Sequence, residues 1–152
     1  MKQLYRAAGT IDRDFVGQIT YTVCLERPLR ELDIEFRFDK QRFSEADVTP
    51  ELVRETAALI REKYGLDGSE ADVRRVILND MKTEIHTLAT LNDEFIGCVH
   101  KQLTDRHMRY VWPDASEGCI PRETFEGVLK VTALVFNVIK DGTRYELIVR
   151  GE

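Results

Sequence analysis

Residues 84–103, EIHTLATLNDEFIGCVHKQL, contain several side chains that could bind a metal. His86, Asp93 and His100 recur at intervals of seven residues. A zinc ion holds its ligand atoms at about 2.0–2.2 Å, whereas seven residues of helix rise by about 10.5 Å. One ion therefore cannot bridge two of these side chains on one helix. The chain has no HxxxH, HExxH or CxxC pair, so we predict no bound metal and no other cofactor.

The apolar residues of this stretch favour a helix over a hairpin. At about 100° per residue they gather on one side, and they are Ile85, Leu88, Ala89, Leu91, Phe95, Ile96, Val99 and Leu103. At the period of a strand, Ile85 and His100 lose a consistent face. We therefore predict a helix over residues 84–103 and reject a turn at Asn92-Asp93. Whether residues 69–103 form one helix or two stays open.

A second candidate site lies in the loop of residues 110–125, which has no periodicity. Cys119 lies in this loop, and a cysteine nucleophile needs a nearby base. His86, His100 or His107 could supply that base if the fold brings one of them close. The alternative, which we expect, is that Cys119 is a small buried residue that closes the loop.

Arginines and an aromatic residue border the same loop. Arg106, Arg109 and Arg122 could together bind a carboxylate or a phosphate, with Trp112 at the rim of a pocket. The alternative is that the arginines are solvated and that Trp112 caps the core.

The composition limits the class of protein. The chain has 152 residues, which predicts a single domain over residues 1–152. Its net charge is −5, which disfavours nucleic acid as a partner. No apolar run approaches the roughly 18 residues of a membrane span. The three cysteines form no disulfide framework, and free thiols are typical of the cytoplasm.

Two regions of the chain predict strands, and the middle predicts helices. Residues 18–25 and 31–39 alternate between apolar and polar side chains, typical of strands with one buried face. Thr49 and Pro50 begin a helix that Gly65 ends, and Ser69 begins the next. Asp141-Gly142 predicts a hairpin between two closing strands. The expected fold is α+β: an antiparallel sheet, formed by an N-terminal meander and a C-terminal hairpin, covered on one face by two or three central helices.

No catalytic signature or nucleotide-binding loop occurs in the sequence. We therefore expect a cytoplasmic domain that binds a small molecule or a protein partner without catalysis. The alternative is a small enzyme, cysteine-dependent, with its site in the 110–125 loop. The predicted helix also carries an apolar seam with Asn92 in its middle, which is typical of paired helices. Its partner is either the first helix of the same chain or the same helix of a second copy, and the second alternative would give a homodimer.

Overall fold

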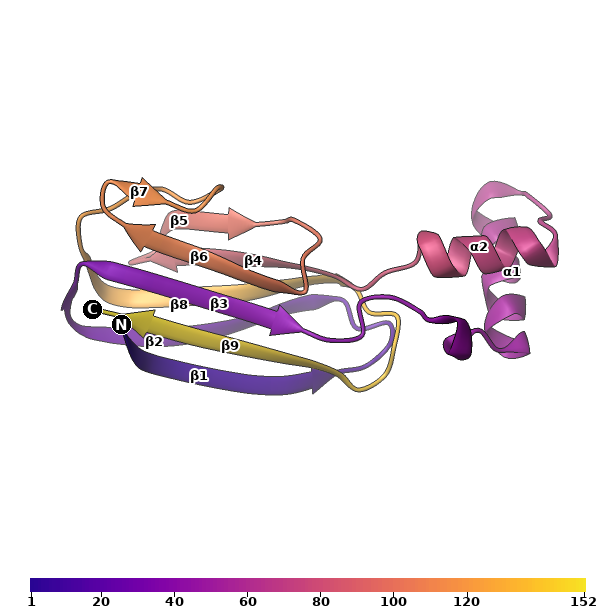
Figure 1. Ribbon diagram of the computed structural model, residues 1–152, viewed down its shortest axis with the longest axis horizontal. Coiled ribbons are helices and arrows are strands. Elements are labelled where there is room, and N and C mark those ends of the chain that lie inside the picture. The colour runs from indigo at the N-terminus through magenta and orange to yellow at the C-terminus, as the bar shows by residue number, and fades with distance from the viewer.

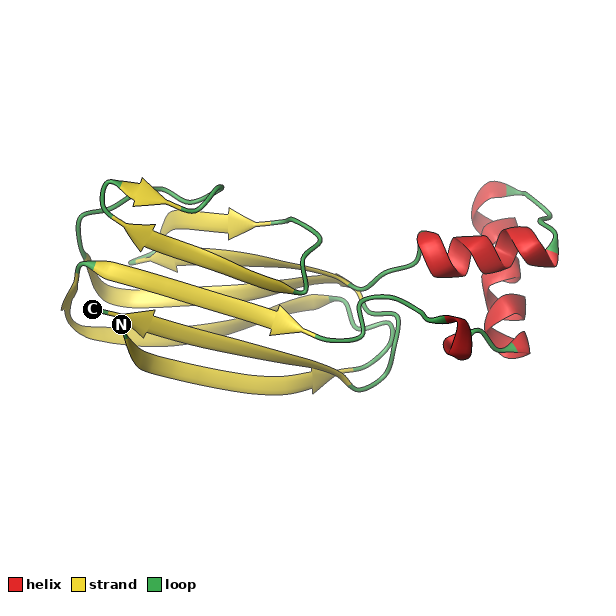
Figure 2. Cartoon of the chain, viewed as in Figure 1, coloured by secondary structure: helices red, strands yellow, loops and turns green.

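The computed structural model describes residues 1–152 and contains two packed antiparallel sheets with a helical arm at one end (Figures 1 and 2). The first sheet has the strand order β1-β9-β3-β6-β7, and the second has the order β2-β8-β4-β5. We call them sheet A and sheet B. Their strands are β1 (Lys2–Ile11), β2 (Gly17–Leu29), β3 (Glu31–Phe38), β4 (Glu84–Leu91), β5 (Glu94–Val99), β6 (Asp105–Val111), β7 (Asp114–Ala115), β8 (Phe125–Asn137) and β9 (Thr143–Gly151).

The core lies between the two sheets because each strand alternates apolar and polar side chains. In β3, Leu32, Ile34 and Phe36 are at most 2% exposed, as the sequence alternation predicts. In β2, Val23 and Leu25 are buried, and Ile19 and Tyr21 pack against the core. The core cluster contains 23 buried residues drawn from both sheets. Burying this apolar surface is the main favourable contribution to folding.

The α+β class with antiparallel sheets is confirmed, but the strands pair differently from the expectation. β1 pairs with β9, β2 with β8, and β3 with β6 and β9. Consecutive N-terminal strands therefore alternate between the two sheets and form no meander. Asp141-Gly142 likewise joins β8 of sheet B to β9 of sheet A, so this loop crosses between sheets and closes no hairpin.

The helix predicted over residues 84–103 is wrong, since these residues form β4, β5 and the start of the next loop. Asn92 and Asp93 have φ angles of 51° and 67°, the left-handed pair that a tight hairpin turn requires. The Asn92 side chain accepts a hydrogen bond from the Val128 backbone N–H at 2.8 Å and donates to the Glu126 carbonyl at 2.9 Å. The paired-helix seam around Asn92 therefore does not exist, and it gives no support to a homodimer.

Two helices form an arm between β3 and β4, and the sequence predicts both ends of α1 and the start of α2. α1 (Pro50–Tyr64) begins after Thr49, whose side chain accepts from the Leu52 backbone N–H, and Gly65 ends it at φ 64°. α2 (Glu70–Asn79) begins after Ser69 and ends before β4, so residues 69–103 contain one helix followed by strands. A short 3₁₀ helix, η1 (Glu45–Asp47), precedes α1. We call residues 45–79 the helical arm.

The arm lies beyond one end of the sheets (Figure 1), and the expected helical cover over a sheet face is not confirmed. Its own core is small and centres on Leu52, Val73 and Ile77. The two linkers of the arm pair with each other, since Arg42 and Lys82 form an isolated antiparallel bridge. Ion pairs join the arm to loops of the sandwich: Asp47 with Lys140 at 2.5 Å, and Glu55 with Arg13 at 3.1 Å. Neither α1 nor α2 is long and apolar enough to cross a lipid bilayer.

Candidate functional site

The outer face of sheet A carries a lattice of charged side chains. Cross-strand neighbours on this face alternate in sign, because Asp33 is paired with Arg109 and Arg150, and Arg37 with Glu146 and Asp105. The lattice contains five arginines and five acidic residues: Arg6, Arg37, Arg109, Arg144, Arg150, Asp33, Glu35, Asp39, Asp105 and Glu146. Positive and negative charges therefore balance across this face, which gives a polyanion no net positive surface to bind.

Two carboxylates at the centre of this lattice are buried. Asp33 and Glu35 are each 7% exposed, although the sequence alternation places them on a solvent face. Arg150 Nη1 lies 3.2 Å from an Asp33 oxygen and 2.7 Å from a Glu35 oxygen. Their long arginine neighbours cover these short side chains and supply the hydrogen bonds that a buried carboxylate requires.

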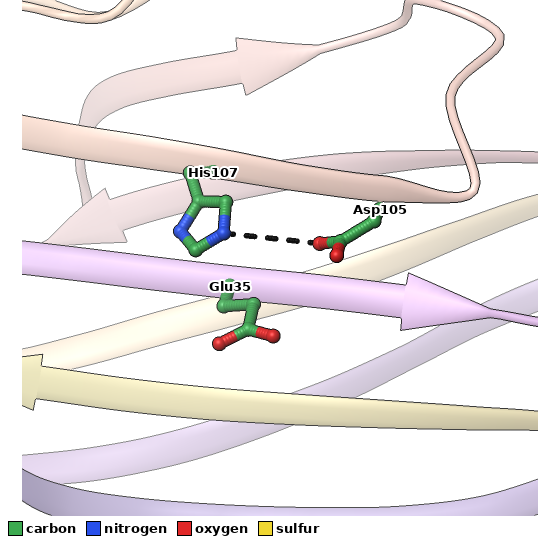
Figure 3. A group of neighbouring side chains, drawn as sticks. All are labelled: Glu35, Asp105 and His107. Carbon is green, nitrogen blue, oxygen red and sulfur yellow. Dashed lines mark ion pairs between the residues drawn. The ribbon is translucent and has the colours of Figure 1, made fainter.

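Glu35, Asp105 and His107 converge on this face (Figure 3), and one ligand atom of each lies within 4.8 Å of the others. His107 Nε2 lies 3.8 Å from Asp105, and Nδ1 lies 2.9 Å from Asp33. A cation bound here would compete with arginines, since Glu35 already contacts Arg150 and also Arg37 at 3.5 Å. The electrostatics therefore favour an ion network among protein groups over a metal site. That no metal binds stays a prediction.

The other two histidines lie far from His107 in the topology, on sheet B and the loop after it. The ring centroids of His86 and His100 are 6.0 Å apart, and the His86 ring lies 4.5 Å from that of Phe136. His86 Nε2 is 3.2 Å from a Glu84 oxygen. No histidine is hydrogen-bonded to a cysteine, serine or threonine side chain, so none is paired with a nucleophile of the kind that a catalytic base activates.

Cys119 lies beside the edge strand β5, where it forms an isolated antiparallel bridge with Gly97. Its Sγ would be 2.7 Å from a Cβ placed on Gly97, so glycine at that position makes room for the thiol. Burial raises the pKa of the Cys119 thiol above its ordinary value, and burial also raises that of Cys98. A raised pKa lowers the thiolate fraction at neutral pH and with it nucleophilic reactivity.

The residues expected to form an anion site at the 110–125 loop do not converge. Arg106 is 4% exposed and points between the sheets, with its guanidinium carbon 5.5 Å from the ring centroids of Phe36 and Phe38. Arg109 belongs to the charged lattice, and Arg122 pairs with Glu94 at 2.6 Å. Trp112 is 52% exposed, so it does not cap the core.

Arg106 is a buried cation without a carboxylate partner. Its Nη1 makes only long hydrogen bonds, at 3.4 Å to the Val99 carbonyl and 3.5 Å to the Lys101 carbonyl. Its Nε has no partner. Burial lowers the pKa of Arg106 to about 10. The two phenylalanine faces provide the main compensation, through cation–π contact.

A hollow lies between the helical arm and the end of the sandwich. We call it the junction hollow, and its volume is about 590 Å³. Ten of its 19 lining residues are hydrophobic: Phe43, Leu52, Leu59, Ile60, Tyr64, Val76, Met81, Phe136, Val138 and Ile139. They come from α1, α2, the linkers and the end of β8. Hollows of this size and composition are typical ligand sites.

Several large apolar side chains around the junction hollow remain open to solvent. Leu59 is 42% exposed, Phe136 is 52% exposed and Tyr64 is 69% exposed. Leu52 of α1 packs on Val73 and Ile77 of α2, whereas Leu59 and Tyr64 are outside this cluster.

Comparison with known proteins identifies the family of the chain. A family model described as "Family of unknown function (DUF6669)" matches residues 1–152. The chain belongs to this family. No curated protein and no solved structure matches it.

The junction hollow was missed by sequence reasoning, although one signal was available. Leu59 and Tyr64 belong to α1, one of the central helices that were expected to cover a sheet. The apolar stripe of α1 also fits a helix that faces a hollow. The sequence pattern alone cannot distinguish these two arrangements, because both require the same apolar positions.

Proposed function

We propose that this member of the DUF6669 family is a cytoplasmic binding module that acts without catalysis and holds a small molecule in the junction hollow. The observation that carries the proposal is the set of exposed apolar side chains, Leu59, Tyr64 and Phe136, around a hollow of about 590 Å³. Apolar surface left open around a concavity is a recurrent mark of a binding site. The three free cysteines support a reducing compartment.

The charged lining suggests the chemical class of the ligand. Lys63 and Lys82 line the hollow and make no ion pair, whereas Arg13 is already paired with Glu55. Three further carboxylates also line the hollow: Asp14, Asp80 and Glu84. An elongated molecule with an apolar body and one anionic end would place its body on Leu59 and Phe136. Its anionic end would then reach a free lysine.

The absence of a paired nucleophile supports binding rather than catalysis. Cys119 has a pKa raised by burial and no hydrogen bond to a histidine. The Asp33–His107 pair, at 2.9 Å, resembles half of a catalytic arrangement. No hydroxyl or thiol is hydrogen-bonded to this imidazole, and Arg150 already contacts the Asp33 carboxylate at 3.2 Å.

The proposal is tested with 8-anilinonaphthalene-1-sulfonate, a fluorescent probe that has an apolar body and one anionic group. Substituting Leu59→Asn or Phe136→Asn should weaken its affinity by roughly tenfold, since each removes about 1–3 kcal/mol of apolar contact. Leu103→Asn is the matched control, because Leu103 is 51% exposed but does not line the hollow. Equal affinities for all four proteins would refute the proposal.

A further inference from the structure

The outer edge of β2 differs from the other sheet edges in having no protection against strand pairing. A sheet edge presents unpaired backbone N–H and C=O groups, and natural proteins protect such edges with charges, prolines, bulges, short strands or covering loops. The two sheets have four edges in this chain: β1 and β7 in sheet A, and β2 and β5 in sheet B.

Three of these edges are protected. β1 has a bulge between Gln3 and Tyr5 and carries Lys2 and Arg6. β7 has only two residues. The outer edge of β5 is covered by the loop that follows β7, since the Cys98 N–H donates to the Gly118 carbonyl at 3.0 Å and the Ile120 N–H donates to the Ile96 carbonyl at 2.8 Å.

The β2 edge has none of these features over residues 17–25. This segment, GQITYTVCL, contains no charged residue and no proline, and it pairs with β8 in one continuous register. No backbone group of residues 17–25 makes a hydrogen bond outside the ladder with β8. The charged residues and proline of β2, in Glu26-Arg27-Pro28, come only after Leu25. Nine residues also exceed the usual strand length of about 5–6.

We propose that two copies of this chain pair through antiparallel β2 edges, so that sheet B continues across a twofold axis. The sequence of the segment is complementary to itself. With Tyr21 on the axis, Thr20 faces Thr22 of the second copy and Ile19 faces Val23. Hydroxyl residues then lie opposite hydroxyl residues and β-branched apolar residues opposite each other, both favourable cross-strand pairs.

The location of β2 allows this pairing without rearrangement. Ile19 and Tyr21 are only partly buried although they pack against the core, because no strand covers them on the open side. A second copy would cover both. An isologous contact of this kind closes after two subunits, so it does not propagate into a fibre. The inference does not depend on the proposed ligand.

Light scattering coupled to gel filtration tests the pairing. The wild-type chain is expected at twice 17.6 kDa at high micromolar concentration. Thr20→Lys/Thr22→Lys places lysines opposite each other in the pair and should reduce the mass to 17.6 kDa. Thr90→Lys, which lies on the same outer face of sheet B but on interior strand β4, should leave the dimer intact.

Three results would overturn the proposal: a wild-type mass of 17.6 kDa at all concentrations, a dimer that survives the double substitution, or a dimer that Thr90→Lys dissociates. The last result would mean that the sheet faces, rather than the edges, meet. If the double variant does not fold, hydrogen exchange of the wild type decides. Amides of residues 17–25 should become more protected as concentration rises, and unchanged protection would contradict edge pairing.

Discussion

The buried arginine at position 106 is the clearest conflict between one residue and its surroundings. The alternation of β6 places Arg106 on the same face as Met108 and Tyr110, both at most 1% exposed. This signal was available in the sequence, but the residue type suggested a solvated position. Period-2 alternation therefore indicates the location of this side chain better than its charge does.

Replacing Arg106 with methionine should stabilise the chain. A buried cation without a counter-ion loses its hydration, and an apolar residue of similar volume avoids that loss. We expect Arg106→Met to raise the free energy of unfolding by about 1–3 kcal/mol, measured by urea denaturation. Arg109→Met, at an exposed position, should change it by no more than about 0.5 kcal/mol. A loss of stability in Arg106→Met would show that the contacts with Phe36 and Phe38 outweigh desolvation.

The two partly buried cysteines should react slowly with thiol reagents. Burial raises the pKa of Cys98 and of Cys119, so both are thiols rather than thiolates at pH 7. In a Cys24→Ser variant, which removes the exposed thiol, labelling at pH 7 should be slower than that of free cysteine. Rapid labelling of Cys119 would instead favour the cysteine-dependent enzyme.

At the scale of elements, the sequence correctly predicted the features that depend on residues close to one another in the chain. The ends of α1 depend on Thr49, Pro50 and Gly65, each of which acts through its own backbone or its nearest turn. The buried face of β3 follows from strict alternation. Strand pairing was not predictable in this way, because it depends on contacts between segments more than 100 residues apart, such as β1 with β9.

The β4–β5 segment was mistaken for a helix for two physical reasons. Leu88 and Cys98 pair on the outer face of sheet B, so apolar residues occur on both faces and weaken the contrast of period 2. A bulge between Ala89 and Thr90 then shifts the register, which breaks the alternation within the segment. The turn residues Asn92 and Asp93 gave the correct signal.

Asn92 should be the most sensitive position of this turn. Asn92→Ala removes two side-chain hydrogen bonds and places alanine at a φ of 51°. The expected loss of unfolding free energy is about 2–3 kcal/mol, measured by thermal or urea denaturation. Asp93→Asn keeps a residue type that tolerates left-handed φ and should cost less than about 1 kcal/mol. Similar effects of the two substitutions would contradict this account of the turn.

The attachment of the arm should weaken in acid. The hydrogen bond from Lys140 lowers the pKa of Asp47 to about 2. Because the folded pKa lies below the ordinary value of 3.8, the contact stabilises the fold above that value and is lost as pH falls toward 2. The hydrogen-exchange protection factors of α1 and α2, which are corrected for the pH dependence of intrinsic exchange, should therefore fall between about pH 4 and pH 2, and the Asp47→Asn variant should lack this pH-dependent change. An identical profile in the variant would assign the effect to other groups.

At the scale of the whole molecule, the two outer faces and the arm have different physical character. The charged lattice of sheet A contains five arginines and five acidic residues, so its charges balance. The junction hollow combines apolar side chains with unpaired lysines. The sequence analysis predicted a binding function but placed it at the 110–125 loop. The hollow depends on the orientation of an arm whose linkers carry no sequence motif.

The most direct test of the binding account is a titration of ¹⁵N-labelled protein with 8-anilinonaphthalene-1-sulfonate, followed by amide chemical shifts. The account predicts saturable shifts on both sides of the junction hollow, in residues 55–64 of α1 and in residues 136–139. Shifts near His107 or Cys119 should be absent. Shifts confined to one side, or spread over the surface without saturation, would contradict a ligand site between the arm and the sandwich.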